Sequence, residues 1–404
     1  MAGFARPSNA SHVAFEVRLP PASSWSGRYY QIGNGGFGGH IDQATLADGA
    51  ARGDAIAGTD TGHQGDGFDL SWAKDHPERL IDYGYRSIKA TSDAARRIMR
   101  TYYGRDASHH YAIGCSNGGR MALMAAARWP GDWDGVIAGA PANPWTVQLA
   151  AFRSLQSYLR GRPERWIPSS KLPHIQAAFL RGCPPGSVRN GVAQRPQACR
   201  AEWAGLACRD MEQPDCLTPA QLASLRAIIR RGYMPAALMP SDWTRWILQE
   251  DRKAPSQWSF AEQSGRFMPA RDKQAALLDI RPPMLNAFRA RGGRIISYFG
   301  WSDAVIAPAM GLDWYQQVAG HGGNPATRRS WYRLFMVPGM VHCQGGVGPT
   351  SFGQSREAPA QSDDRIHDVR RALEAWVEQG RPPDLLIAHD AGAQTSTIAD
   401  LRPE

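Results

Sequence analysis

Short hydrophobic runs and amphipathic stretches alternate along the first third of the chain. The runs predict strands, because residues typical of strands are enriched in them and several end in glycine-rich turns. The amphipathic stretches predict helices at 87–103 and 120–128. The predicted strands lie at 13–19, 29–32, 55–58, 110–113 and 136–138. Strand and helix in alternation favour a parallel sheet with crossover helices.

The middle of the chain has a different pattern. Between about Pro144 and Pro283 strand signals nearly vanish, and short helical stretches such as 219–231 alternate with loops containing proline, tryptophan and cysteine. We interpret this region as an inserted, mainly helical lid that packs over the sheet.

The α/β pattern then resumes. Strands are predicted at 294–299 and 331–337, and an amphipathic helix at 366–379. The predicted organisation is an α/β core of mostly parallel strands interrupted by a large insertion. Its parts are a first core segment at 1–143, the lid at 144–285 and a second core segment at 286–404.

Composition fits a large globular protein. The chain has 404 residues, of which 43% are hydrophobic and 21% charged, so a sizeable core can form. The longest apolar run, Met121–Ala127, is too short to cross a bilayer, and no membrane partner is expected. The first twenty residues lack a basic start followed by an apolar stretch, so the sequence shows no signal peptide.

The net charge of +9 comes almost entirely from arginine. A basic protein of this kind can bind nucleic acid, anionic lipid or an acidic substrate. The sequence has no block of five like charges and no zinc-finger spacing. We therefore expect a solvated cationic surface and no nucleic-acid partner.

The six cysteines favour disulfides. Four of them crowd one loop-like stretch rich in proline and glycine, at Cys183, Cys199, Cys208 and Cys216. Their spacing lacks the CxxC pairs typical of zinc ribbons, so no metal is expected there. Disulfides indicate an oxidising compartment, and we expect a secreted or periplasmic protein.

The strongest chemical signal is a glycine-flanked serine. The segment Gly114-Cys115-Ser116-Asn117-Gly118 matches G-x-S-x-G, with a predicted strand before it and a helix after it. That context forces a sharp turn that presents the Ser116 hydroxyl above the sheet, as a nucleophile needs. The backbone N–H of Asn117, at the start of the helix, is a candidate oxyanion donor.

A serine hydroxyl needs a base and an acid that orients the base. Asp303 follows the predicted strand at 294–299, and His342 follows the one at 331–337. Both lie at carboxyl ends of strands and follow Ser116 in the chain order typical of such enzymes. His63, in a loop after an early strand, is the main competitor. We interpret it as structural and Asp60 as a turn or capping residue.

The cysteines provide an independent check of this assignment. Cys115 precedes the proposed nucleophile and Cys343 follows the proposed base. If Ser116 and His342 meet, their neighbours lie near the Cα separation of roughly 4.4–6.8 Å that a disulfide requires. One bridge would then fasten nucleophile to base.

A second oxyanion donor is expected from a glycine-rich loop after an early strand. The loop 33–39, GNGGFGG, fits this role, with the N–H groups of Gly35 and Gly36 both as candidates. A phosphate-binding loop is the alternative, but the sequence has no G-K-[ST] after the glycines and no dinucleotide fingerprint.

Taken together, these segments resemble the tannase and feruloyl esterase family, which also includes mono(hydroxyethyl) terephthalate hydrolase. The resemblance extends from about Ser11 to about Pro383. It is carried by GNGGFGG, GTDTGHQG, DYGYRS, GCSNGGRMAL, WPGDWDGVIAGAPA, CLTPAQLASLRAI, GWSDAVIAP and VPGMVHCQGG.

The resemblance implies an α/β-hydrolase core with an inserted lid and the triad Ser116, Asp303 and His342. It also implies three disulfides, which are Cys115–Cys343, Cys183–Cys199 and Cys208–Cys216. The implied substrates are esters of aromatic acids, such as gallate, hydroxycinnamates or a terephthalate monoester.

The sequence departs from the family pattern after Cys183. Members usually carry an aspartate-rich calcium loop there, whereas this chain has Pro184, Gly186 and Asn190. Calcium prefers carboxylate oxygens, so we expect no cofactor and no tightly bound calcium. Aromatic and arginine residues of the predicted lid are candidate substrate contacts, with packing of the lid as an equal alternative. They are Trp243, Trp246, Trp258, Phe260 and Arg245.

Three functions remain in competition at this point. The leading one is a serine ester hydrolase that cleaves feruloyl or galloyl esters through an acyl-enzyme, with a terephthalate-monoester hydrolase as the alternative. A non-catalytic binding protein on the same fold is the second. A basic protein that binds nucleic acid or a charged surface is the third, and salt-dependent DNA binding without esterase turnover would distinguish it.

Overall fold

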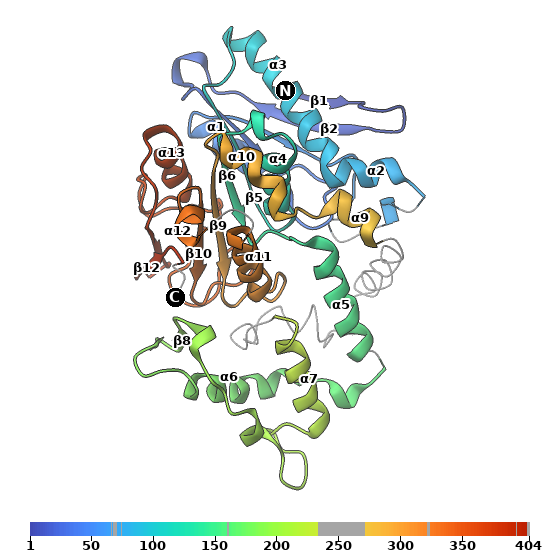
Figure 1. Cartoon of the computed structure of the whole chain (residues 1–404), viewed down its shortest axis with the longest axis vertical. Coiled ribbons are helices and arrows are strands. Elements are labelled where there is room, and N and C mark those ends of the chain that lie inside the picture. The colour runs from blue at the N-terminus through green and yellow to red at the C-terminus, as the bar shows by residue number, and fades with distance from the viewer. Residues whose placement is uncertain are drawn as a thin grey trace.

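The computed structural model of the chain describes residues 1–65, 67, 71–73, 75–159, 161–232, 271–320, 324–392 and 394–401. Eight strands form one sheet in the order β1-β2-β4-β3-β5-β6-β9-β10 (Figure 1). Their bounds are β1 Ala2–Ala5, β2 Val13–Arg18, β3 Arg28–Ile32, β4 Ala55–Thr59, β5 His109–Cys115, β6 Gly135–Gly139, β9 Arg294–Gly300 and β10 Tyr332–Val337.

The sheet is mostly parallel, as the sequence predicts. All pairs from β4 through β3, β5, β6 and β9 to β10 are parallel, whereas β1–β2 and β2–β4 are antiparallel. Every residue of β4, β6 and β10 is buried. β4 and β6 are nearly continuous hydrophobic runs because helices cover both sides of the sheet there, whereas β10 includes Arg333, which is buried and pairs with Asp400.

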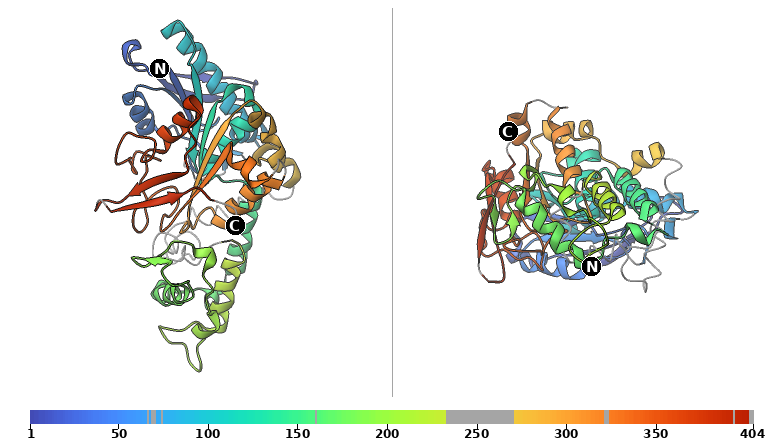
Figure 2. Two further views of the ribbon diagram at one scale, coloured as in Figure 1. Left: turned by 60° about the vertical axis from the view of Figure 1, so that its left-hand side comes forward. Right: turned by 90° about the horizontal axis from the view of Figure 1, so that it is seen from below.

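Helices cover the sheet on its two faces (Figures 1 and 2). Met99, Leu123 and Phe288 belong to the hydrophobic core on one face, and Leu46 and Leu373 to the core on the other. The helices are α1 Gln43–Ala51, α2 Pro77–Ile81, α3 Ser87–Tyr103, α4 Asn117–Arg128, α5 Trp145–Leu159, α6 Leu172–Arg181, α7 Pro219–Ile229, α9 Arg271–Leu278, α10 Asn286–Ala290, α11 Pro308–Gly320, α12 Pro325–Arg329 and α13 Val369–Gln379.

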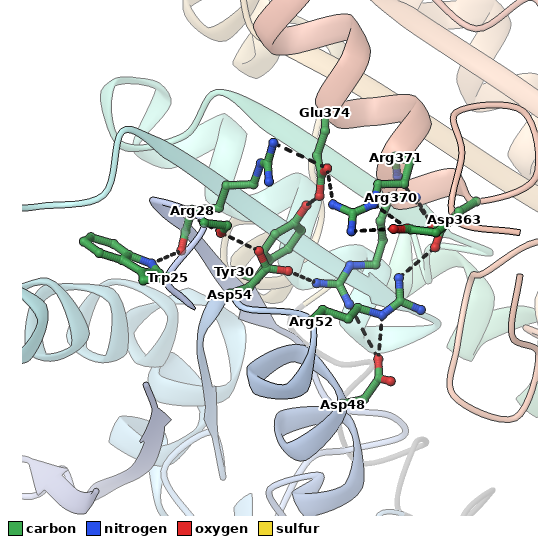
Figure 3. A network of polar contacts seen from close by, with 12 residues as sticks. Trp25, Arg28, Tyr30, Asp48, Arg52, Asp54, Asp363, Arg370, Arg371 and Glu374 are labelled. Atoms are coloured by element: carbon green, nitrogen blue, oxygen red, sulfur yellow. Dashed lines mark hydrogen bonds and ion pairs between the residues drawn. The ribbon is translucent and has the colours of Figure 1, made fainter. Parts of the chain in front are cut away.

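A network of polar and charged side chains ties α13 to one face of the sheet (Figure 3). The Tyr30 hydroxyl on β3 donates to Glu374 at 2.5 Å, and Arg370 pairs with the buried Asp54 at 2.7 Å. Arg52, at the end of α1, pairs with Asp368 at 2.7 Å. Because these charges are paired, α13 can rest on the sheet without leaving an uncompensated buried charge.

The insertion lies between β6 and β9 in the chain. Its residues 161–232 form the lobe at the bottom of Figure 1, and α5 leads from the sheet domain to this lobe. Leu155, Ile175, Leu206 and Leu225 belong to a small hydrophobic core of the lobe, which reaches Ala307 of the sheet domain. A two-stranded hairpin, β7 Val188–Arg189 and β8 Val192–Ala193, completes the lobe.

Several element ends differ from the sequence prediction. The helix predicted at 120–128 begins at Asn117, directly after the strand, because Ser116 alone makes the turn. The helix predicted at 366–379 begins at Val369, because the side chain of Asp368 accepts hydrogen bonds from Arg370 N and Arg371 N and caps it. The hairpin of β11 Leu385–His389 and β12 Thr395–Ala399 was not predicted.

Candidate active site

Ser116 occupies the tight turn between β5 and α4. Its φ of 60° and ψ of −126° are rare for a residue with a side chain. Backbone hydrogen bonds hold the turn. Ser116 N donates to Gly139 O at 2.9 Å, and Ser116 O accepts from Arg120 N and Ala142 N at 3.0 Å each. The flanking elements therefore impose the strained conformation on the serine.

Three glycines let the backbone pack closely around this turn. A Cβ at Gly33, after β3, would lie 2.5 Å from the Cα of Gly118, and a Cβ at Gly114 would lie 2.6 Å from its carbonyl carbon. No real Cβ tolerates such contacts. Because glycine has no Cβ, the loop after β3 can lie directly against the first turn of α4.

Asp303 and His342 meet at the carboxyl ends of β9 and β10. His342 Nδ1 lies 2.8 Å from Asp303 Oδ2. The other carboxylate oxygen, Oδ1, accepts from the backbone N–H groups of Val305 and Ile306 at 2.8 Å each. Asp303 is completely buried, so its carboxylate is fixed in position and held against the imidazole.

A disulfide joins the neighbours of Ser116 and His342. Cys115 and Cys343 are bridged with a Cα–Cα distance of 5.9 Å, across 228 positions of sequence. The bridge fastens the end of β5 to the loop that carries His342. The lobe contains the pairs Cys183–Cys199 and Cys208–Cys216, so all six cysteines are paired as the family resemblance implies.

The loop after β3 borders the serine turn. Around the position that a Cβ of Gly35 would take, no heavy atom lies within 4 Å, so this backbone faces open space. Gly36 has a φ of 56°, and its carbonyl accepts from the hydroxyl of Tyr83 at 3.2 Å. Asn117 is buried at the start of α4, close to the same loop.

A chain of buried polar side chains, which the sequence did not reveal, connects this loop to α4. Arg120 Nε donates to Asn117 Oδ1 at 2.8 Å, and Asn117 Nδ2 donates to the backbone oxygen of Asn34 at 3.2 Å. Asn34 Nδ2 in turn donates to Thr59 O at 3.0 Å. These bonds fix the first turn of α4 relative to the glycine loop.

Arg120 is fully buried, and burial lowers the pKa of its guanidinium. Its other hydrogen bonds go to the carbonyl oxygens of Gly84, Tyr83 and Leu278. Asp279, whose negative charge acts on this guanidinium, accepts hydrogen bonds from the backbone N–H and the hydroxyl of Thr146. A signal for Arg120 was present in the sequence, since it stands four residues after Ser116 in GCSNGGR.

Comparison with known proteins identifies the family. The family model described as tannase and feruloyl esterase matches residues 3–244 and 259–403. The chain belongs to the tannase and feruloyl esterase family. It is a carboxylic ester hydrolase, as the names of its relatives indicate.

Curated relatives in the family share about a quarter to a third of their residues with the chain. An uncharacterized esterase of Xanthomonas campestris pv. campestris is 34% identical, covering 96% of this chain and 76% of that protein. Feruloyl esterase B of Aspergillus niger is 26% identical, covering 96% of this chain and 79% of that protein.

Solved structures show that this family member has the α/β-hydrolase fold. Feruloyl esterase B from Aspergillus oryzae superimposes with a TM-score of 0.82 at 23% identity, over 98% of this chain and 85% of that one. The tannin acyl hydrolase from Aspergillus niger superimposes with a TM-score of 0.74 at 20% identity, over 99% and 82%.

The competing histidine lies in the loop after β4. His63 is buried and stacks on Trp72, with ring centroids 3.8 Å apart. Asp60, beside it in sequence, accepts from Ala14 N at 3.0 Å and from Gly62 N at 2.8 Å. Burial raises the pKa of Asp60 to about 6. In this esterase both residues have evident packing and turn contacts.

The segment where the family usually carries calcium does not fit that ion here. Between Cys183 and Cys199 the sequence has no aspartate or glutamate. Asn190 Nδ2 donates to Gln394, and Ser187 donates to Pro184 O, so these polar groups have protein partners. Calcium favours several carboxylate oxygens, which this loop lacks.

The candidate substrate contacts of the predicted lid lie outside the described residues; they are Trp243, Arg245, Trp246, Trp258 and Phe260. Of the helices that the structure describes, none is both long and apolar enough to cross a membrane.

Proposed function

We propose that this esterase cleaves esters of aromatic acids, of the feruloyl or galloyl type, through an acyl-enzyme on Ser116. The observation that carries the proposal is the pairing of His342 with the buried Asp303, on a loop that a disulfide fastens beside Ser116. Family membership and relatives named feruloyl esterases support the substrate class.

The proposed reaction has two steps. In the first step His342 takes the proton of the Ser116 hydroxyl while Oγ of Ser116 attacks the ester carbonyl carbon. The same proton then passes from His342 to the departing alcohol. Water, activated by His342, hydrolyses the acyl-enzyme in the second step. Asp303 holds the proton on Nδ1 of His342 and stabilises the imidazolium that forms in both steps.

The negative oxygen of each tetrahedral intermediate needs preorganised donors. We assign this role to the backbone N–H of Asn117 and to that of Gly35 or Gly36. The open space at Gly35 favours this position. The Asn34–Asn117–Arg120 bonds support the assignment because they hold the two donor segments together.

We further propose that the insertion acts as a lid over the site and that the protein works in an oxidising compartment. The lid role is supported by its place in the chain, since α5 begins shortly after the carboxyl end of β6. The compartment is supported by three disulfides that include all six cysteines.

An ester panel tests the proposal. Wild type and Ser116→Ala are compared on methyl ferulate, methyl gallate, p-nitrophenyl acetate and mono(hydroxyethyl) terephthalate. We expect turnover of the ferulate or gallate ester that Ser116→Ala abolishes. Preferred turnover of the terephthalate monoester would instead support the alternative substrate. Turnover that survives the substitution would contradict the serine mechanism.

A further inference from the structure

The positive charge of the chain is concentrated in the insertion. Residues 161–232 contain eleven basic and five acidic side chains, which leaves a net +6 of the chain's +9. Within this segment, residues 181–200 have four arginines and no acidic side chain. We call residues 181–200 the arginine loop. Its arginines are Arg181, Arg189, Arg195 and Arg200.

The four arginines are exposed and have no carboxylate partner in the described part of the chain. The only side-chain hydrogen bonds recorded for them there run from Arg200 to the carbonyl oxygens of Gln197 and Cys199. Several arginines of the sheet domain do have carboxylate partners. Arg52, Arg370 and Arg371, for example, each pair with an aspartate (Figure 3). The guanidinium groups of the arginine loop therefore remain available to an outside anion.

The backbone of the arginine loop is held rigidly. Arg181 and Arg200 lie at its two ends, which Cys183–Cys199 and a 2.6 Å hydrogen bond from Arg200 N to Gly182 O bring together. Arg189 lies in the hairpin and pairs in register with Val192. A preorganised loop loses less conformational freedom when it binds a ligand.

The arginine loop lies next to the loop that carries His342. Val192 Cγ1 is 3.2 Å from where a Cβ of Gly339 would be, and Gly339 precedes His342 by three residues. Asn190 also bonds to Gln394, in the turn between β11 and β12. Figure 1 shows β8 directly below this end of the sheet domain. A chain bound along the loop would lie beside the proposed active site.

The facing turn between β11 and β12 carries one carboxylate, Asp390, which is engaged within the turn. Asp390 accepts hydrogen bonds through Oδ1 from the backbone N–H groups of Gly392 and Gln394, at 2.9 Å each. Glu202 follows the loop in sequence, two positions after Arg200. Neither carboxylate forms an ion pair with the four arginines among the described residues.

We propose that the arginine loop binds a polyuronate, an acidic polysaccharide whose sugars carry the aromatic ester that this enzyme cleaves. This inference rests on the proposed function, in which the sugar chain is the alcohol that leaves. Each uronate carboxylate suits a guanidinium, which can bind it through two parallel hydrogen bonds. Positive charge beside the site also raises the local concentration of an anionic substrate.

The composition of the arginine loop lacks features typical of nucleic-acid and lipid binding. Residues 181–200 include no aromatic side chain on which a nucleic-acid base could stack. They also include no leucine, phenylalanine or tryptophan of the kind that enters a lipid surface. Nucleic acid and anionic lipid are therefore the comparison ligands of the test.

Binding is measured on Ser116→Ala protein, so that hydrolysis does not interfere. The probe is polygalacturonate. Its affinity is measured by titration calorimetry at low and at high salt. One variant replaces Arg181, Arg189, Arg195 and Arg200 with glutamine. The matched control replaces four exposed arginines elsewhere in the lobe, and these are Arg162, Arg209, Arg226 and Arg230.

We expect the loop variant to bind polygalacturonate at least about ten-fold more weakly, the combined effect of four exposed ion pairs, and the control variant to bind within about two-fold of the parent. High salt should weaken parental binding, because exposed charges are screened. Equal losses in the two variants, or no binding by the parent, would overturn the proposal. So would equal binding of duplex DNA or of phosphatidylglycerol vesicles.

A second readout separates this inference from the proposed function. In the active enzyme, kcat/KM is compared for a feruloylated oligogalacturonide and a neutral feruloylated arabino-oligosaccharide. We expect the ratio of kcat/KM for the acidic substrate to kcat/KM for the neutral one to fall toward one in the loop variant. In the control variant this ratio should stay as high as in the parent. If the enzyme hydrolyses methyl ferulate but does not prefer the acidic oligosaccharide, the proposed role of the arginine loop is overturned and the proposed function stands. If the protein binds polygalacturonate but hydrolyses no ferulate ester, the binding role of the arginine loop is supported and the proposed function is overturned.

Discussion

At the scale of single residues, the two carboxylate oxygens of Asp303 have separate tasks. Oδ1 accepts two backbone N–H groups from the turn after β9, and Oδ2 faces His342. An asparagine can keep the first task with its amide oxygen, but it presents an N–H where the imidazole needs an acceptor. The substitution therefore separates structure from catalysis.

Replacing Asp303 with asparagine should lower kcat for methyl ferulate by about 10³- to 10⁴-fold, because the imidazole is left in the wrong tautomer. The melting temperature should change little, since the turn keeps its acceptor. Asp313→Asn, an exposed aspartate on α11, is the matched control and should retain full activity. Near-normal turnover by the Asp303 variant would exclude this residue from the triad.

Asn34 is a positioning residue, because its contacts act through the backbone of the glycine loop. Asn34→Ala removes the side-chain bonds to Thr59 O and Asn117. We expect kcat to fall about ten- to hundred-fold as an oxyanion donor is misplaced, with KM little changed. Affinity for an arylboronic acid, which forms a tetrahedral anion on the serine, should fall in parallel.

The control for this substitution is Asn324→Ala. Asn324 caps α12 far from these contacts in sequence and accepts from Thr327 N at 2.9 Å. Its loss should cost about 1 kcal/mol of stability without lowering kcat. If both variants lose stability and neither loses boronate affinity, Asn34 has only a structural role.

The residues that carry the proposed chemistry were predictable from sequence because each stands in a local motif. Ser116 sits between glycines, and Asp303 and His342 follow hydrophobic strands. Asn34 and Arg120 were not predicted. Asn34 meets Asn117 across 83 positions, and only the packing of β3 beside β5 brings them together.

At the scale of elements, the site depends on how closely the loop after β3 approaches α4. Gly33→Ala places a methyl group against the backbone of Gly118, which cannot move without shifting the serine turn. We expect the free energy of unfolding to fall by about 2 kcal/mol, with a loss of kcat.

Chemical denaturation and kinetics on the same variant measure both effects. Gly131→Ala is the control, because no atom lies within 4 Å of its added Cβ. It should change the unfolding free energy by less than about 0.5 kcal/mol. Normal stability and activity in Gly33→Ala would show that the close approach is not required.

Strands with nearly continuous apolar sequences and helices with distinct polar and apolar faces were predicted, whereas short or weakly patterned elements were not. β4 and β6 are almost wholly apolar in sequence because helices cover the sheet on both sides there. β1 is a short edge strand with an exposed and half-buried pattern. α1 begins at the Asp42 cap and buries only Leu46 and Gly49, so its sequence carries little periodicity.

At the scale of the whole molecule, one buried carboxyl links stability to pH. Asp60 joins the turn after β4 to Ala14 of β2, and burial raises its pKa to about 6 from the ordinary value of 3.8. The folded protein therefore holds this proton more tightly than the unfolded chain. The contribution of Asp60 is most favourable below pH 4 and is lost as pH rises through 6.

Asp60→Asn should remove this dependence, since the amide oxygen can still accept from Ala14 N and Gly62 N. The unfolding free energy of wild type relative to the variant should fall by on the order of 2 kcal/mol between pH 4 and pH 6.5. Urea denaturation at several pH values measures the difference. A constant difference across this range would contradict the raised pKa.

The organisation of the chain into a sheet domain and an inserted lobe could be predicted only in outline. A change of sequence texture near Pro144 indicated an insertion. It did not indicate that the lobe has its own hydrophobic core or that the four arginines of the arginine loop make no ion pair with any described carboxylate. Both properties follow from which side chains meet in three dimensions.

Mass spectrometry of the acyl-enzyme tests the central claim most directly. The enzyme is mixed with excess methyl ferulate, quenched in acid during steady-state turnover and digested. We predict a feruloyl group on the peptide that contains Ser116, and none on that peptide when Ser116→Ala is treated in the same way. Turnover without any modified peptide, or a feruloyl group on another residue, would contradict the account.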